Sequence, residues 1–272
     1  MKKTLSVTLA FVFLIVMLTS CGAPSIPGNV LDPAASKAPG ASDAPAEPDE
    51  PDAPAASSTV DTSGLGPIGA SFARYTDMKG KAYERVSAKI EEKPELGMYA
   101  MTLLPITMMD LALIPLTIVD MDETAAAMTL GFLGAENVKV SKDGNKRTVT
   151  YTDSEGKSVK FAADYDQATD SVQAAITDDT GKEALFFEYV KVGGGYASQY
   201  YSAESEGSTE VITAFFDESN ITAFGFKKSA GKPGSIFKNT GITADLVKGG
   251  DTYVVMQDGK TTVHENGQDK TY

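Results

Sequence analysis

The stretch LFFEYVKVGGGYASQYY, residues 185–201, predicts a β-hairpin at the centre of the fold. Leu185, Phe187 and Tyr189 alternate with their neighbours, and such alternation is typical of a strand with one buried face. The three glycines at 193–195 favour a hairpin turn over a phosphate-binding loop, because no helical pattern follows them. Aromatic side chains on both arms predict a cross-strand ladder in a core rather than a sugar-stacking surface. They are Phe186, Phe187, Tyr189, Tyr196, Tyr200 and Tyr201.

The same rhythm extends outward on both sides of this hairpin. Turn-forming residues recur at steps of twelve to fourteen residues, with alternating runs between them, and another turn falls at Asp258-Gly259. The regular turns are Asp143-Gly144, Glu155-Gly156, Gln167, Thr180-Gly181, Gly194, Glu206-Gly207, Ser219-Asn220 and Gly231. We expect an antiparallel up-and-down meander of about nine or ten strands, a size that tends to curl into a half-barrel or barrel-like sheet.

Upstream of the meander the apolar spacing changes to steps of three and four, which indicates an amphipathic helix ending at Lys93-Pro94. Its apolar face is Phe72, Tyr75, Met78, Ala82, Val86 and Ile90. The sequence from Asp120 to Glu123 resembles a capping box and predicts a short helix that closes at Gly131 or Gly134. The predicted fold class is therefore α+β, with N-terminal helices packed on a large antiparallel meander sheet.

Residues 101–120, MTLLPITMMDLALIPLTIVD, repeat one ten-residue pattern twice, and each copy ends in aspartate. From Leu96 to Val119 the only charge is Asp110, so this segment must be buried, and we expect Pro105 and Pro115 to break it. It is either a plug that fills the curved sheet or a lid over a lipid-sized cavity. A membrane span is disfavoured by the prolines and the central carboxylate. As a lid it would line an apolar ligand with Met98, Met101, Leu103, Met108, Met109 and Leu113.

Composition divides the chain into three parts. Residues 1–20 have the pattern of a signal peptide, and residues 21–66 form a linker with eight of the thirteen prolines and no aromatic residue. A flexible linker of this length spans roughly 35–40 Å. Residues 67–272 are globular in composition, with a helical and apolar part at 67–135 and the meander at 136–272.

The N-terminus, MKKTLSVTLAFVFLIVMLTSC, resembles the signal of bacterial lipoproteins. Lys2 and Lys3 precede an apolar run, and Leu18-Thr19-Ser20-Cys21 matches the lipobox order of leucine, two small residues and cysteine. The run is shorter than the roughly 20 residues of a transmembrane helix. The resemblance implies cleavage before Cys21, a lipid on its sulfur, and attachment to the extracytoplasmic face of a bacterial cell membrane.

Charge and residue chemistry exclude several functions. A formal net charge of −13 disfavours nucleic acid and anionic lipid as partners of the folded part. Cys21 is the only cysteine, so a lipidated chain has no disulfide and no thiolate nucleophile. The only histidine, His264, is expected to be structural or exposed. Asp164, Asp166 and Asp170 share one loop, where we expect solvated turn acids rather than a calcium site. We expect no metal and no cofactor.

These observations predict a monomeric, non-enzymatic lipoprotein that acts as a binding or structural module of the cell envelope. The alternative is a carrier or sensor of a lipid or other apolar ligand, held between the curved sheet and residues 96–119. A hydrolase is a third, less favoured class. The predicted layout is similar to that of half-barrel lipoproteins that shuttle lipids in bacterial envelopes. This similarity is one of architecture alone and implies no site residues.

Overall fold

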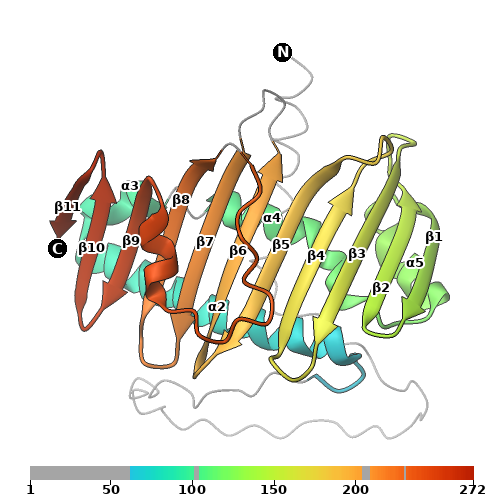
Figure 1. Ribbon diagram of the computed structural model, residues 1–272, viewed down its shortest axis with the longest axis horizontal. Coiled ribbons are helices and arrows are strands. Elements are labelled where there is room, and N and C mark those ends of the chain that lie inside the picture. Colours follow the sequence, from blue (N-terminus) through green and yellow to red (C-terminus); the bar gives the residue numbers. More distant parts are fainter. Residues whose placement is uncertain (1–61, 101–103, 204–208, 230) are drawn as a thin grey trace, which may run out of the picture. The chain divides into compact units, whose positions relative to one another are not determined.

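An eleven-stranded antiparallel sheet dominates the computed structural model of this chain, which describes residues 62–100, 104–203, 209–229 and 231–272 (Figure 1). The described residues belong to one compact unit. The predicted signal peptide, the lipidation site Cys21 and residues 22–61 of the linker lie outside them, so these assignments stay predictions.

Strand order in the sheet follows chain order from β1 to β11, and every neighbouring pair is antiparallel. The strands are β1 (Glu136–Asp143), β2 (Lys146–Thr152), β3 (Ser158–Asp166), β4 (Ser171–Thr177), β5 (Glu183–Val192), β6 (Gly195–Ala203), β7 (Thr209–Asp217), β8 (Thr222–Ser229), β9 (Thr252–Gln257), β10 (Lys260–Glu265) and β11 (Gln268–Thr271). The up-and-down meander is therefore confirmed. The sheet is not closed into a barrel, because β1 and β11 each have one neighbour.

Turn chemistry explains the register of the hairpins. The predicted Asp258-Gly259 turn joins β9 to β10, and both residues have positive φ values, 51° and 73°, as a tight two-residue turn requires. Asn266-Gly267 repeats this geometry at 53° and 74° and adds β11, a strand that the sequence interpretation missed. Gly195 begins β6, where a Cβ atom would lie 2.1 Å from the Phe216 carbonyl oxygen, so no larger residue fits there.

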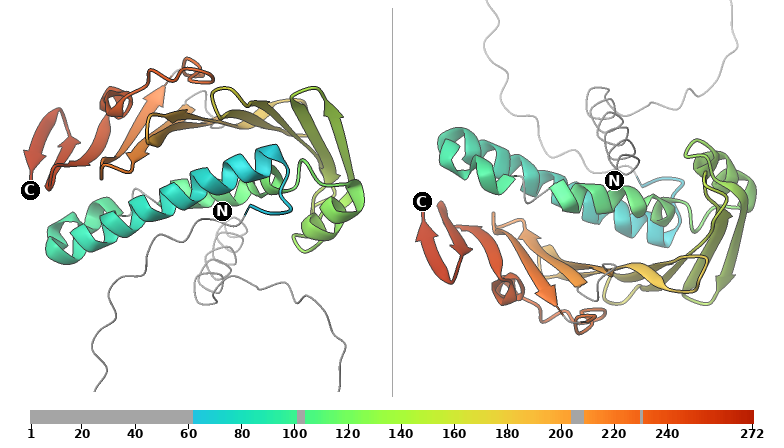
Figure 2. Two further views of the ribbon diagram at one scale, coloured as in Figure 1. Left: turned by 90° about the horizontal axis from the view of Figure 1, so that it is seen from below. Right: turned by 90° about the horizontal axis from the view of Figure 1, so that it is seen from above.

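Helix α2 (Pro67–Glu92) confirms the predicted amphipathic helix. Proline occupies its first turn, where no amide hydrogen is needed, and Lys93 is the C-cap, directly before Pro94. Tyr75 of α2 stacks on Tyr189 of β5 with ring centroids 4.6 Å apart. Figure 2 shows α2 running across the concave face of the curved sheet, which we call the inner face. The opposite side is the outer face.

The apolar repeat forms α4 (Leu104–Ala112) and the 3₁₀ helix η3 (Ile114–Thr117). Each proline is the second residue of its helix, so the segment is divided just before Pro115, and both prolines lie in the first turn of a helix rather than ending one. The buried apolar side chains described in this segment are Ile106, Leu113, Leu116, Ile118 and Val119, and all belong to the main hydrophobic core. Among the residues that the structure describes, no helix combines the length and apolarity needed to cross a membrane.

The two aspartates that close the repeat units fasten this segment to its surroundings. Asp110 pairs with Lys79 of α2 and accepts a hydrogen bond from the Tyr200 hydroxyl of β6 at 3.0 Å. Asp120 accepts from the Ile68 backbone amide at 2.8 Å and from Arg147 Nε at 2.7 Å. Each copy of the repeat therefore supplies an apolar segment followed by a polar attachment to α2 and to a strand.

Helix α5 (Glu123–Gly131) lies beside β1 at one end of the sheet (Figure 1). The predicted short helix is confirmed, but the predicted capping box from Asp120 to Glu123 is not: Asp122 is the N-cap and accepts a hydrogen bond from the Ala125 amide at 3.0 Å. Short helices η1 (Pro94–Leu96) and α3 (Gly97–Ala100) follow α2.

A segment between β8 and β9, residues 231–251, crosses the outer face and carries the 3₁₀ helix η4 (Ala244–Gly249). We call this segment the strap. Its side chains Ile236 and Val247 are buried in a second hydrophobic cluster with Val190, Phe215 and Val255 of the outer face. The sequence interpretation did not predict the strap.

Candidate functional site

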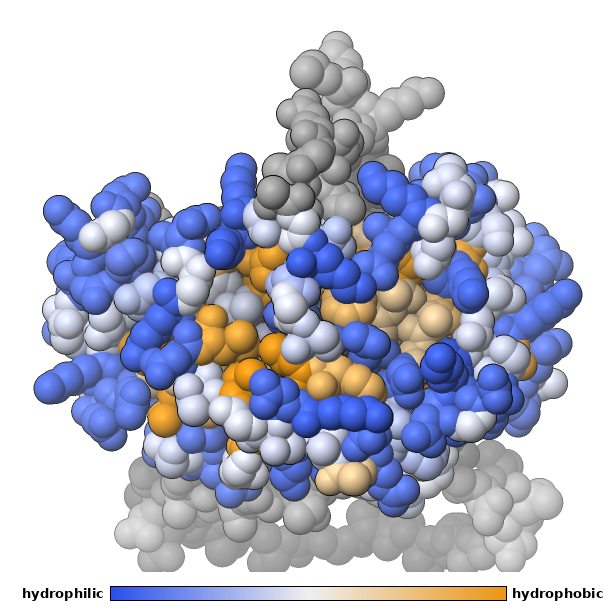
Figure 3. All heavy atoms as spheres, in the orientation of Figure 1, coloured by the Kyte–Doolittle hydropathy of each residue, from blue (hydrophilic) through white to orange (hydrophobic). Residues whose placement is uncertain are grey.

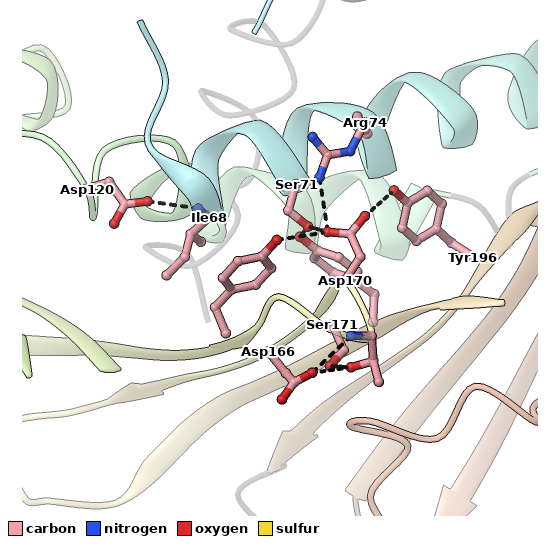
Figure 4. A network of polar contacts seen from close by, with 11 residues as sticks. Ile68, Ser71, Arg74, Asp120, Asp166, Asp170, Ser171 and Tyr196 are labelled. Carbon is pink, nitrogen blue, oxygen red and sulfur yellow. Dashed lines mark hydrogen bonds and ion pairs between the residues drawn. The ribbon is translucent and has the colours of Figure 1, made fainter. Parts of the chain in front are cut away.

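A polar network between α2 and the inner face centres on Asp170, in the turn from β3 to β4 (Figure 4). Its Oδ1 atom accepts hydrogen bonds from Ser71 Oγ at 2.6 Å and Arg74 Nη2 at 3.1 Å, while its Oδ2 atom accepts from the Tyr196 hydroxyl at 3.1 Å. Burial opposes ionisation, but the Ser71 hydrogen bond and the Arg74 charge outweigh it and lower the pKa of Asp170. This carboxylate is therefore a charged anchor for the first turns of α2.

The network continues along α2. Ser71 Oγ lies 2.8 Å from the Tyr189 hydroxyl. One turn farther along the helix, the Tyr75 hydroxyl donates to Ser198 Oγ at 3.0 Å and lies 3.0 Å from the hydroxyl of Tyr200. Tyr200 in turn donates to Asp110, which links this network to the apolar repeat.

The electrostatics of this network on the inner face indicate a structural role. A hydroxyl nucleophile needs a neighbouring base that takes its proton near neutral pH. Burial raises the pKa values of Tyr75, Tyr189 and Tyr200 above the ordinary tyrosine value, so these groups stay neutral. Asp170 is a weak base because its pKa is lowered. The arrangement therefore holds α2 on the strands and is poorly suited to activating Ser71.

The outer face offers a different kind of site, an open pocket of about 450 Å³ between the strap and the strands, which we call the strap pocket. Its lining combines apolar side chains from the strands and the strap with polar groups of the strap: Val192, Gly193, Phe215, Ile221, Thr240, Ile242, Thr243, Ala244, Asp245, Lys248, Val255 and Gln257. Asp245 and Lys248 form an ion pair at 2.7 Å. An apolar lining with a few polar groups, at this volume, is typical of small-molecule sites.

Glu188 of β5 fixes the start of the strap. Its side chain is fully buried on the outer face and accepts hydrogen bonds from Gln173 Nε2 at 2.6 Å and Gln199 Nε2 at 2.7 Å. From the strap, the Ile236 amide donates to it at 2.9 Å and Ser235 Oγ also bonds to it. A buried carboxylate with four donors is satisfied, so Glu188 binds the strap to the sheet without an exposed charge.

The second half of the strap rests directly on β8. A Cβ atom at Gly225 would lie 2.5 Å from the Val247 carbonyl oxygen, so only glycine allows η4 to approach this closely. The Asp251 amide donates to the Phe226 carbonyl at 2.8 Å, and the Asp251 carboxylate accepts from the Lys228 amide at 2.9 Å. The strap is therefore fixed at both ends, and residues of its second half, between 240 and 248, line the pocket.

A second hollow of about 410 Å³ lies on the outer face over β2–β5. Ala162 and Ala175, which are register partners on β3 and β4, both line it, and Lys146 and Lys160 also contribute. Lys232 of the strap lies 3.4 Å from the centre of the Phe186 ring at one side. In Figure 3 this hollow corresponds to a pale orange, weakly apolar area, on the same face as the deep orange, strongly apolar area around the strap.

The residues predicted to line an apolar ligand lie elsewhere. Leu113 is 1 % exposed in the main core, and Met109 is half-buried against the same core. The structure places Met98 in α3 and Met108 in α4 without describing their side chains, whereas Met101 and Leu103 lie outside the described residues. Neither Leu113 nor Met109 lines the strap pocket.

Other predicted site residues have structural partners. His264 stacks on Tyr253, with ring centroids 4.6 Å apart, and its Nδ1 atom lies 2.6 Å from Asp269. The expectation of solvated turn acids is wrong for Asp170, which lies under α2, while Asp166 pairs with Lys238 of the strap at 3.0 Å. Within the described parts of the chain, no three potential metal-ligating side chains come together.

The aromatic ladder is confirmed as core packing for the rings on the inner face: Phe187 and Tyr200 are cross-strand partners with ring centroids 4.6 Å apart. The sequence interpretation missed Glu188 and the strap. The one available signal was a carboxylate at position 188 within an apolar strand. No protein-family model matches this chain, and comparisons with curated proteins and with solved structures find no similar protein.

Proposed function

We propose that this chain is a lipid-anchored module of a bacterial cell envelope that binds a small apolar or amphipathic ligand in the strap pocket without chemical conversion. The lipid anchor rests on Leu18-Thr19-Ser20-Cys21 in the sequence. The observation that carries the binding function is the strap pocket itself, because it combines an apolar lining with polar groups on a fixed scaffold.

In this proposal the helical part between residues 67 and 131 is the packed cover of the inner face, in a half-barrel-like arrangement. The ring contacts and hydrogen bonds of α2 with β5 and β6 support this role. Leu113 and Leu116 already pack in the core on the inner face. The strap pocket is therefore favoured over residues 96–119 as the ligand site.

Binding is tested with the neutral fluorescent probe N-phenyl-1-naphthylamine and two matched substitutions on the outer face. Ala244→Phe fills the strap pocket, whereas Ala162→Phe adds the same bulk to the second hollow. We expect probe fluorescence with the parent and with Ala162→Phe, and a loss of about tenfold or more in affinity with Ala244→Phe. Equal affinities for the two variants, or no binding by the parent, would contradict the proposal.

The anchor is tested separately by metabolic labelling with a fatty-acid analogue. Cys21→Ser removes the sulfur that carries the lipid, so we expect the label on the parent protein and none on the variant. Equal labelling of the two proteins would refute the anchor while leaving the ligand proposal intact.

A further inference from the structure

Three large apolar side chains are exposed among the described residues, and all lie at the end of α5. Phe132 is 90 % exposed, Met128 67 % and Leu133 49 %; we call these three residues the α5 patch. Met128 and Phe132 are four residues apart, so they lie on the same side of the helix end. Single exposed apolar residues are common, but three adjacent ones indicate a surface with a partner.

The composition of α5 supports this view. Residues 124–135 contain no charged side chain, and Ala126 and Leu130 on the other side of the helix are buried. A helix that is apolar on all sides is normally enclosed. Here one side packs against the protein and the other is exposed, so a partner has to come from outside the folded domain.

The path of the chain points to that partner. Residues 62–66 lead from the predicted tether into α2, and Gly66 lies against Asp120, where an added Cβ would be 2.0 Å from the Asp120 Cβ atom. Asp120 is two residues before Asp122, the N-cap of α5. Because α5 is about 14 Å long, the tether joins the folded domain within roughly one short helix of the patch.

We propose that the α5 patch inserts into the bilayer that holds the lipid on Cys21, so that the membrane is its partner. This inference rests on the lipid anchor of the proposed function. A tether of roughly 35–40 Å keeps the patch near the membrane at about millimolar effective concentration, so even weak insertion is populated. Apolar insertion also suits a protein whose net charge of −13 opposes simple adsorption to anionic lipid.

A second copy of the chain fits the patch less well. The neighbouring edge strand β1 carries exposed Lys139 and Lys142, and lysine on an edge strand disfavours pairing with another edge. Edge-to-edge pairing of β1 with a second copy of this chain is therefore disfavoured.

The test uses the full-length lipidated protein in vesicles of phosphatidylethanolamine and phosphatidylglycerol. Because Cys21 carries the lipid, Phe132→Cys provides one free thiol for an environment-sensitive fluorophore. Met128→Cys is a second position in the patch, and Ser219→Cys, in the exposed turn between β7 and β8, is the control. All three positions lie on the surface, so the labels need not disturb the core.

We expect the emission of labels at 128 and 132 to shift to the blue and to fall by about twofold or more with doxyl-labelled lipids, while the label at 219 does not change. Equal, water-like emission at 132 and 219 would overturn the inference. A blue shift that grows with protein concentration and ignores the lipid quencher would overturn it in favour of a second copy. Mass spectrometry of the same sample separates the two proposals: unacylated Cys21 refutes the anchor and the insertion together, whereas acylated protein with an unquenched label refutes insertion alone.

Discussion

Among the described residues, α2 and the helices between 104 and 117 lie along the inner face of the sheet, whereas the strap crosses the outer face (Figure 2). On the inner face, each repeat unit ends in an aspartate that reaches both α2 and a strand, and aromatic rings fill the space between them. On the outer face, Glu188 and Asp251 fix the two ends of the strap, and an open pocket lies beside residues 240–248. The comparison shows that acidic side chains attach segments to both faces of the sheet, while the proposed ligand site lies on the outer face alone.

The largest expected effect comes from placing a charge in the closed inner face. Leu113→Asp puts an unpaired carboxylate at a position that is 1 % exposed, and we expect a loss of at least about 3 kcal/mol in the free energy of unfolding. Leu133→Asp is the matched control, since Leu133 is 49 % exposed. Thermal unfolding of the two variants measures the difference. Similar melting temperatures would show that residues 104–119 do not close the core.

A somewhat smaller effect is expected when one partner of a buried ion pair is removed. Asp110→Ala leaves Lys79, which is 4 % exposed, without its carboxylate, and we expect a loss of about 3 kcal/mol. Burial already lowers the pKa of Lys79, and Asp110 is the group that opposes this shift. Asp77→Ala breaks the more exposed ion pair with Lys81 and should cost less than about 0.5 kcal/mol.

The double variant Asp110→Leu with Lys79→Met tests why Asp110→Ala loses stability. The loss can come from leaving Lys79 without a charge partner or from removing the volume of the Asp110 side chain. Because it removes both charges, we expect it to recover most of the stability that Asp110→Ala loses. Urea denaturation of the single and double variants gives this comparison. If the double variant is as unstable as Asp110→Ala, the ion pair between Lys79 and Asp110 does not stabilise the fold as described.

Asp170 gives the inner face a dependence on pH. Its pKa in the folded protein lies below the ordinary aspartate value of 3.8, so the stability it contributes is present above that value and is lost as pH falls through the lower folded pKa. Asp170→Asn should therefore cost about 1–3 kcal/mol at pH 7 and progressively less below pH 4. Urea midpoints at several pH values measure this, with the exposed Asp179→Asn as control. A constant difference at every pH would contradict the ionic role.

The smallest effect on global stability is expected on the outer face. Glu188→Gln weakens the attachment of the strap start, so we expect amide hydrogen exchange in residues 235–243 to accelerate about tenfold while the melting temperature changes little. Glu183→Gln, at the half-exposed pair with Lys232, is the control and should leave exchange unchanged. Uniform acceleration across the sheet would show that the strap is part of the main cooperative core.

Local signals in the sequence were sufficient for the meander, because each turn depends on a few adjacent residues such as Asp258-Gly259. The periodicity of α2 was equally local. The strap depends on contacts such as that between Glu188 and the Ile236 amide, 48 residues apart, in a segment without regular periodicity. No spacing rule could have found it.

The sequence also could not predict the direction in which individual side chains point. Asp170 has the sequence of a turn acid, yet its backbone, at φ 44°, places the carboxylate under α2. The repeat predicted burial of residues 101–120 but not that Asp110 and Asp120 would attach it. The sequence predicted a short helix at α5 but not that the three residues of the α5 patch would be exposed.

Hydrogen exchange of the full-length protein with and without N-phenyl-1-naphthylamine tests the central claim most directly, because it reports both faces of the sheet in one experiment. If the ligand site is the strap pocket, the probe will slow exchange in residues 240–248 and leave residues 104–119 unchanged. Protection of residues 104–119 with an unchanged strap would contradict the account and place the ligand on the inner face.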